Sequence, residues 1–241
     1  MSRYFRALYE RTMREAYGFA HRAAIRAMEG GGELLDCGAG AGHLYEDTLR
    51  PAGVALDRYH GVEWHGETVA SVHGQDVRQG DLNRPLPFSD DSFRCVIGLS
   101  VLEHLLRPCA FLRECHRVLA SDGTLVILTP NISTYFTAAL ILAGRMPSSG
   151  PTPDSALLVE SEELVKVRHV DFARDETSDT PQHRHLVVFS FLVLRRYLRM
   201  LGFRSVRGRG FGLYPFPNTA QRFLEKLDPY HCHQMVFVAT K

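Results

Sequence analysis

The chain has 241 residues, a length that suits one α/β domain with an insertion as well as two small domains, and we favour one domain. Its 28 basic and 27 acidic residues leave a formal net charge of +1, so charge alone would not recruit nucleic acid or an anionic membrane, and a small, locally recognised partner is favoured. The five cysteines form no C-x-x-C pair, and the charged segment Met1–Met28 lacks the apolar core of a signal peptide. We therefore expect a cytoplasmic protein with no integral membrane contact.

Strands and helices are predicted to alternate through the first half of the chain. Residues 1–30 carry apolar side chains at helical spacing, which predicts an N-terminal helical cap. A short apolar strand at Glu33–Cys37 then leads into the glycine loop Gly38–Gly42 and a helix that runs through Leu49. Further strands are predicted at Tyr59–Glu63, Val77–Leu82, Cys95–Leu99 and Thr124–Thr129. Strand, glycine loop and helix in this order are typical of the opening of a doubly wound parallel sheet.

The pattern changes after residue 131. An apolar helix at Tyr135–Ala143 is followed by a Pro- and Ser-rich loop at Met146–Asp154, and we interpret residues 132–185 as an insertion. Ser190 is a predicted N-cap for a late helix that ends at Gly202. Residues 186–241 then supply this helix and two closing strands, predicted at Phe203–Val206 and Met235–Thr240 and joined through Gly208–Pro217.

The glycine loop carries the first functional signal. Gly38, Gly40 and Gly42 are evenly spaced, whereas a dinucleotide site usually has the spacing G-x-G-x-x-G/A. Asp36 precedes the loop by two residues, where its carboxylate would repel a pyrophosphate but favour a ligand with an ammonium and a sulfonium, such as S-adenosylmethionine. The alternative is that Asp36 only caps the loop or the following helix.

Two more acidic residues follow the next strands. Glu63 can accept hydrogen bonds from both hydroxyls of a ribose, although an acid at this place also occurs in NAD sites. Asp81 can accept the amino group of an adenine while the Leu82 N–H faces a ring nitrogen, or it can simply be a turn residue.

In combination these segments resemble the class I methyltransferases of the methyltransferase-11 type over Glu33–Asn131. The resemblance rests on Leu34–Gly42 (LLDCGAGAG), Gly61–Glu63 (GVE), Gly80–Leu82 (GDL), Leu86–Phe93 (LPFSDDSF) and Leu102–Leu105 (LEHL). It implies a Rossmann-like seven-stranded sheet, mostly parallel with an antiparallel last strand, helices on both faces, and S-adenosyl-L-methionine as cofactor. The donor contacts are then expected at Asp36, Gly38, Ala39, Gly40, Gly42, Glu63, Asp81, Leu82 and Ser100.

Residues 33–131 are accordingly the expected donor-binding core, and residues 132–185, which have no generic counterpart in the family, are expected to shape the acceptor site. Deleting Ser148–Asp154 is expected to change acceptor kinetics more than donor affinity. A second departure is Arg94, where family members commonly have Asp; it should lie at the start of a strand, away from the donor.

A general base is optional for this chemistry, because methyl transfer from a sulfonium has an excellent leaving group and alignment can supply much of the rate. If the acceptor is a hydroxyl, His185 is the first candidate base and His104 the second. The alternative makes His104 a scaffold residue, and His183 and His185 surface residues.

We expect no metal. His231 and His233 would share one strand face, but two ligands are too few for zinc. Glu103 with His104 in a magnesium-type site is a minor alternative, because magnesium prefers oxygen ligands.

The predicted function is methyl transfer from S-adenosyl-L-methionine to a small-molecule or lipid- or sugar-linked acceptor, with oxygen favoured as nucleophile. Nucleic-acid methylation is disfavoured because Leu99–Leu102 replaces the Asp/Asn-Pro-Pro-aromatic motif of base-amino methyltransferases. The alternatives are a nicotinamide-dependent oxidoreductase and a non-catalytic S-adenosylmethionine-binding protein. Neither the acceptor nor the oligomeric state is predicted.

Overall fold

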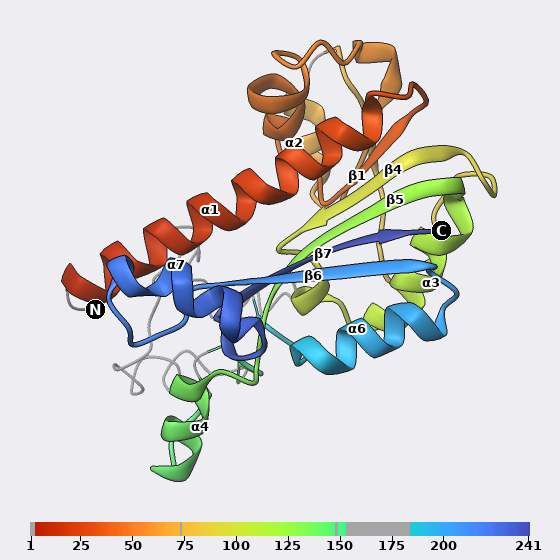
Figure 1. The fold of residues 1–241 in the computed structure, drawn as a ribbon. Coiled ribbons are helices and arrows are strands. Elements are labelled where there is room, and N and C mark those ends of the chain that lie inside the picture. Colours follow the sequence, from red (N-terminus) through yellow and green to blue (C-terminus); the bar gives the residue numbers. More distant parts are fainter. Residues whose placement is uncertain (1–2, 73, 148, 153–183) are drawn as a thin grey trace.

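The computed structural model describes residues 3–72, 74–147, 149–152 and 184–241. They form a seven-stranded sheet with the order β3-β2-β1-β4-β5-β7-β6 (Figure 1). Its strands are β1 (Leu34–Cys37), β2 (Tyr59–Glu63), β3 (Asp76–Gln79), β4 (Phe93–Leu99), β5 (Leu119–Pro130), β6 (Ser205–Phe211) and β7 (Gln234–Thr240). Strands β1 to β5 pair in parallel, and β7 runs antiparallel between β5 and β6. The predicted Rossmann-like sheet with a reversed last strand is confirmed.

Helices cover both faces of this sheet (Figure 1). They are α1 (Arg3–Met28), α2 (Gly66–Ser71), α3 (Pro108–Val118), α4 (Tyr135–Leu142), α6 (Phe191–Met200) and α7 (Asn218–Leu227). Single helical turns occur at η1 (Tyr45–Leu49), η2 (Leu56–Arg58), η3 (Leu102–His104) and η6 (Pro229–His231). No helix within the described ranges is long and apolar enough to cross a membrane.

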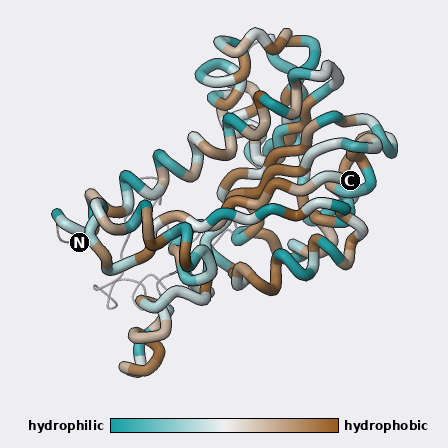
Figure 2. The backbone as a smooth tube through the Cα atoms, viewed as in Figure 1, coloured by the Kyte–Doolittle hydropathy of each residue, from teal (hydrophilic) through white to brown (hydrophobic). Residues whose placement is uncertain are grey.

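Side-chain alternation along the central strands divides the core into two layers. On β5, Val126 and Leu128 pack toward α1, while Leu125 and Ile127 pack toward α3 and α6. The brown central strands in Figure 2 mark this doubly buried sheet. Helix α1 lies close to the sheet because fully buried small residues recur every four positions, at Ala16, Ala20 and Ala24.

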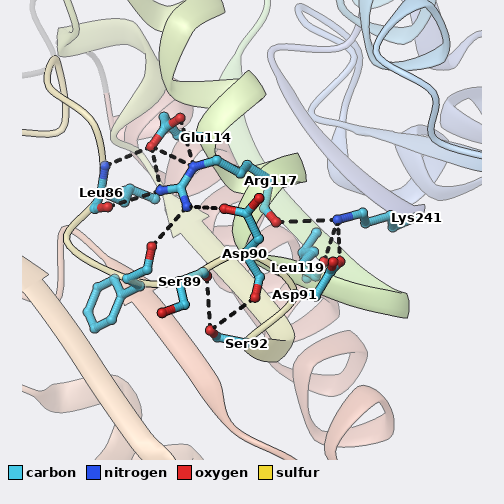
Figure 3. A network of polar contacts seen from close by, with 10 residues as sticks. Leu86, Ser89, Asp90, Asp91, Ser92, Glu114, Arg117, Leu119 and Lys241 are labelled. Carbon is cyan, nitrogen blue, oxygen red and sulfur yellow. Dashed lines mark hydrogen bonds and ion pairs between the residues drawn. The ribbon is translucent and has the colours of Figure 1, made fainter.

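The segment Leu86–Phe93 has a structural role that the family motif alone does not explain (Figure 3). The Arg117 guanidinium, near the end of α3, donates to the carbonyl oxygens of Leu86 and Phe88 and to the carboxylates of Asp90 and Glu114. Glu114 in turn accepts the Leu86 N–H at 2.9 Å. This network holds the connection between β3 and β4 against α3, and β4 leads directly into the candidate site.

Several predicted elements need correction. Strand β3 ends at Gln79, not at Leu82, so Asp81 lies in the loop beyond it. Strand β6 occupies Ser205–Phe211 where Phe203–Val206 was predicted, and α7 was not predicted at all. The helix after the glycine loop is short and includes a π-helical turn over Tyr45–Leu49.

Other local predictions agree with the structure. The Ser190 hydroxyl accepts the Val193 N–H and caps α6 as expected. Arg94, near the start of β4, donates to the carbonyl oxygens of Ala27 and Asp122, which places it at the end of the strand opposite the glycine loop. The subdivision of the chain into cap, core, insertion and closing segment stays a prediction.

Candidate functional site

The glycine loop lies at the carboxyl end of β1 and is tied to β2. The N–H groups of Gly38 and Ala39 both donate to the Val62 carbonyl, at 2.8 and 3.1 Å. Gly38, Gly40 and Gly42 all have positive φ angles, of 81°, 52° and 76°. Residues that carry a side chain rarely adopt this left-handed backbone conformation. The backbone of the loop therefore requires glycine at these three positions.

The three glycines face different surroundings. A Cβ atom added to Gly38 would lie 2.4 Å from Val101, and one added to Gly42 would lie 2.3 Å from Gln75, so both positions are packed against the protein. Among the residues that the structure describes, none besides its chain neighbours lies within 4 Å of a Cβ atom added to Gly40. Gly40 therefore leaves open space at the carboxyl edge of the sheet, which is where parallel α/β sheets bind ligands.

Glu63 closes β2 and reaches the same loop. Its side chain is buried, and its carboxylate accepts the Gly40 N–H at 2.9 Å and the His65 N–H at 3.1 Å. A carboxylate has about four acceptor positions, so the two remaining positions fit the vicinal hydroxyls of a ribose. The support that Glu63 gives to the loop backbone is a second role that the sequence analysis did not predict.

Asp36 is buried beneath the loop and accepts a hydrogen bond of 2.8 Å from the Tyr59 hydroxyl. Burial raises the pKa of Asp36 to about 7, the hydrogen bond from Tyr59 opposes this, and the charge of Glu63 adds to it. A cationic ligand nearby would favour the ionised carboxylate. The predicted preference for an ammonium or a sulfonium is thus compatible with the local electrostatics.

Asp81 and Leu82 follow β3 in a turn. The Asp81 carboxylate accepts the backbone N–H of Asn83 at 2.8 Å and its side-chain amide at 2.9 Å, which is an Asx-turn. Its second oxygen lies 3.9 Å from the Arg84 Nε atom. The turn interpretation of Asp81 is therefore realised, and a ligand contact remains open to the second oxygen.

Ser100 lies just after β4 in a left-handed conformation, with φ of 55°. Its hydroxyl accepts a hydrogen bond of 3.1 Å from the Tyr17 hydroxyl of α1. A non-glycine residue in this region is uncommon and costs conformational energy. Here it turns the chain from β4 into η3 and connects α1 to the same sheet edge as the glycine loop.

A second polar group lies at the ends of β4 and β5. Glu103 in η3 is 2 % exposed and accepts a hydrogen bond of 2.9 Å from the Thr129 hydroxyl. Burial raises the pKa of Glu103 to about 7. His104 and His185 are half-buried beside it, with ring centroids 5.1 Å apart. The two candidate bases therefore form one cluster with Glu103.

His185 reaches this cluster through backbone pairing. The Leu186 N–H donates to the Glu103 carbonyl at 2.7 Å, and the Thr152 N–H donates to the His185 carbonyl at 2.9 Å. His183 and the stretch 153–183 of the expected acceptor insertion lie outside the described residues. Of that insertion the structure describes residues 132–147, 149–152 and 184–185, and its returning end lies along η3.

Aromatic residues that the sequence analysis left without a role surround the cluster. Burial, with smaller effects from Tyr17 and Glu103, raises the pKa of Tyr9 to about 12. Burial and the charge of His185 lower the pKa of His233 to about 4, so this imidazole is neutral near pH 7. The Tyr9 and His233 rings lie 6.0 Å apart. These residues come from α1 and the segment before β7, so only the folded chain brings them together.

The expectation that His231 and His233 share a strand face is wrong. Strand β7 begins at Gln234, after both residues. The His231 imidazole lies 2.8 Å from the Asp228 carboxylate, whereas the His233 ring lies 5.1 Å from the ring of Tyr214.

Comparison with known proteins shows what this part of the chain resembles. Residues 35–127 match the family model described as a methyltransferase domain. A probable S-adenosylmethionine-dependent methyltransferase of Mycolicibacterium smegmatis is 34% identical over 123 residues, which are 48% of this chain and 42% of that protein. Residues 35–127 are therefore similar to the class I S-adenosylmethionine-dependent methyltransferases. The resemblance drawn from the sequence motifs is confirmed, and the nicotinamide-dependent alternative is not supported.

Other relatives support the methyltransferase match but do not identify the acceptor. A ubiquinone biosynthesis O-methyltransferase of Parvibaculum lavamentivorans is 32% identical over 103 residues, 41% of this chain and 40% of that protein. The chain thus spans less than half the length of these curated relatives.

Solved structures share the whole fold at low identity. A SAM-dependent methyltransferase from Archaeoglobus fulgidus has a TM-score of 0.57 at 19% identity and covers 100% of both chains. The [4+2]-cyclase SpnF has the same TM-score of 0.57 at 18% identity, over 92% of this chain and 80% of that one. Because a cyclase shares the fold, the fold alone does not specify the reaction.

Proposed function

We propose that the domain transfers the methyl group of S-adenosyl-L-methionine to a small-molecule or lipid- or sugar-linked acceptor, with an oxygen nucleophile favoured. The observation that carries the proposal is the placement of two groups along one sheet edge. The open glycine loop with Glu63 lies after β1 and β2, and the cluster of Glu103, His104 and His185 lies after β4. Strands β1 and β4 are neighbours, so a donor and an acceptor bound at the two groups would meet.

The donor fits the first group in shape and in charge. Gly40 leaves room for close approach, Glu63 keeps acceptor positions for a ribose, and Asp36 offers a buried carboxylate to a cationic ligand. When bound, the cofactor supplies a methyl group on a sulfonium. We propose donor contacts at Asp36, Gly38, Ala39, Gly40, Gly42, Glu63, Asp81, Leu82 and Ser100.

The residues of the second group would orient the acceptor. The Nδ1 atoms of His104 and His185 each face a backbone carbonyl oxygen, so in cation-free protein only Nε2 can accept a proton. We propose His185 as the base for a hydroxyl acceptor and His104 as the second candidate. Residues 132–185 are proposed to form the wall of this acceptor site.

Two observations support a small-molecule acceptor and an oxygen nucleophile. Some curated relatives are named as ubiquinone biosynthesis O-methyltransferases, and the near-zero net charge gives no general attraction for nucleic acid. We further propose a cytoplasmic location, which the five free cysteines support.

The test is an acceptor screen with a labelled methyl donor against aqueous and lipid-soluble metabolite fractions. The wild type should label a compound, and Gly40→Val protein should not. Thermal shifts measured in parallel should show stabilisation by S-adenosylhomocysteine and none by NAD, because only a ligand of the native state raises its stability. A protein that binds S-adenosylhomocysteine but labels no fraction would support the non-catalytic alternative.

A further inference from the structure

Three metal-ligand side chains meet at the carboxyl ends of β4 and β5. Glu103, His104 and His185 each offer one ligand atom, and these atoms all lie within 4.8 Å of one another. The Glu103 Oε1 atom and the His104 Nε2 atom lie 4.0 Å apart. Four-coordinate ligands at about 2.0–2.2 Å from a cation lie about 3.4 Å apart. Side-chain adjustments of about 1 Å would therefore close the three ligands around an ion.

The hydrogen bonds of both imidazoles prepare them for this role. The Nδ1 atom of His104 lies 2.9 Å from the Arg184 carbonyl oxygen, and that of His185 lies 2.6 Å from the Ser149 carbonyl oxygen. A carbonyl oxygen can only accept, so Nδ1 carries the proton in both rings and the lone pair is on Nε2. Histidine ligands of metals are commonly fixed in this way, with the other ring nitrogen donating to a backbone carbonyl.

The carboxylate has a supporting partner of its own. Thr129 donates to the Oε2 atom of Glu103, which leaves Oε1 on the side of His104. Among the described residues, Glu103 forms no ion pair with a lysine or an arginine, although it is 2 % exposed. A buried carboxylate is costly unless a counter-charge or a metal accompanies it. A divalent cation would provide that charge.

We propose that Glu103, His104 and His185 bind one divalent transition-metal ion. Two nitrogen ligands and one carboxylate favour an ion of the Zn²⁺ type over Mg²⁺, which prefers oxygen ligands. This inference departs from the sequence expectation of no metal, because that expectation could not place His185 beside Glu103. Three protein ligands leave at least one coordination position open.

The open position suits the oxygen of an acceptor hydroxyl, a role that rests on the proposed methyl transfer, whereas cation binding itself does not. Coordination lowers the pKa of such a hydroxyl, so its proton can leave to solvent and the oxygen becomes the nucleophile. In the cation-loaded protein His185 is then a ligand, and in the chelated protein its Nε2 atom acts as the base.

Cobalt(II) is the probe, because its visible absorption reports ligand number and type while calorimetry reports affinity. Chelator-treated wild-type protein should bind one Co²⁺ per chain. His185→Ala should weaken binding at least about 100-fold, and Thr129→Val, which removes only the hydroxyl that supports Glu103, should weaken it about 10–100-fold. The matched control is His231→Ala, which removes an imidazole paired with Asp228 outside the cluster and should leave Co²⁺ affinity unchanged.

Less than one Co²⁺ per chain in the wild type would overturn the proposal, as would equal losses in His185→Ala and His231→Ala. If His185→Ala fails to fold, as judged by circular dichroism, the Co²⁺ affinities of Thr129→Val and His231→Ala are compared instead. Equal affinities in these two variants would then overturn the proposal. Binding of S-adenosylhomocysteine is measured on the same samples. Retained S-adenosylhomocysteine binding without Co²⁺ uptake would reject the metal site alone, and Co²⁺ uptake without S-adenosylhomocysteine binding would reject the proposed donor site alone.

Discussion

The candidate site has two halves along the sheet edge, one after β1 and β2 and one after β4 and β5. The two halves differ in whether backbone or side chains form them. After β1 and β2, the candidate site is formed by the backbone of the glycine loop, and Glu63 holds that loop by accepting the Gly40 N–H. After β4 and β5, it is formed by the side chains of Glu103, His104 and His185, and the last of these is contributed by a segment about 80 positions further along the chain. The three loop positions with positive φ favour glycine, whereas a site made of side chains can change its chemistry by single substitutions.

This difference explains why the donor half can be recognised in the sequence as a motif. The donor half needs left-handed backbone at fixed spacing, and that requirement appears in the sequence as alternate glycines. The second half needs only that distant side chains meet, which imposes no local pattern. We therefore expect substitutions in the first half to weaken or remove cofactor binding, and substitutions in the second half to change the reaction while cofactor binding persists.

The largest expected effect is that of Gly40→Val, which should reduce S-adenosylhomocysteine binding below detection by calorimetry. A branched side chain would occupy the open space beside the loop, and the left-handed backbone would add strain of about 1–2 kcal/mol. Gly53→Val is the matched control, because Gly53 also has positive φ and open surroundings but lies outside the loop. Unchanged affinity in Gly40→Val, or an equal loss in Gly53→Val, would contradict the assignment of the donor loop.

The next largest effect is expected in the side-chain half of the site, at His185. In chelator-treated protein, His185→Gln should lower the single-turnover rate of methyl transfer to a hydroxyl acceptor about 10²–10⁴-fold, the usual contribution of a general base. Affinity for S-adenosylhomocysteine should stay at the wild-type value. His231→Gln serves as the control for loss of an imidazole elsewhere. An unchanged rate in His185→Gln would mean that alignment alone drives the reaction.

Much of the fold could be predicted because local pattern and tertiary environment agree. Strand β2 has the predicted bounds, and the apolar runs of β4 and β5 are buried on both faces. Helix α7 was missed because its pattern is inverted: the buried positions are Gln221 and Glu225, which bind Arg11 of α1, while Phe223 is exposed. Hydrophobic periodicity cannot identify a helix whose buried face is polar.

Strand β6 shows the opposite difficulty. Gly208 and Gly210 suggested a loop, yet both lie within the strand. An added Cβ atom at Gly208 would lie 2.5 Å from Phe191, and one at Gly210 would lie 2.4 Å from the Pro229 carbonyl oxygen. These glycines are required by close packing against neighbouring elements, a constraint that is not visible in the sequence. The same limit applies to the cluster of Glu103, His104 and His185: the sequence analysis paired Glu103 with His104 but could not place His185 beside them.

A smaller effect separates the two roles of Glu63. Glu63→Ala should weaken S-adenosylhomocysteine binding by about 1.5–3 kcal/mol, the usual range for hydrogen bonds to a charged group. Part of this loss comes from release of the Gly40 N–H and affects every donor analogue equally. Binding of a 2′,3′-dideoxy analogue, measured by calorimetry, isolates the rest, because it lacks both ribose hydroxyls. Equal losses for the two ligands would show that Glu63 supports the loop without contacting the ribose.

The smallest effect concerns Asp36 and the pH dependence of donor affinity. Burial raises the pKa of this carboxyl to about 7 in the free protein, against the hydrogen bond from Tyr59 and with the charge of Glu63. A ligand that carries an ammonium and a sulfonium would favour the ionised form and lower that pKa. Donor binding then releases a proton below pH 7, so affinity rises with pH and becomes constant above about pH 8.

For a pKa of about 7, the ionised fraction of Asp36 increases about tenfold between pH 6 and pH 8, so S-adenosylmethionine should bind about tenfold more weakly at pH 6. Asp36→Asn removes the titrating carboxyl while it preserves the side-chain shape. This variant should bind S-adenosylmethionine more weakly than the wild type, and its affinity should lack this component of the pH dependence. The slope difference between the two proteins, measured by calorimetry in buffers of different ionisation enthalpy, also reports the proton released. If both proteins show the same slope, Asp36 does not sense the charge of the donor, and its buried carboxyl serves the loop and Tyr59 alone.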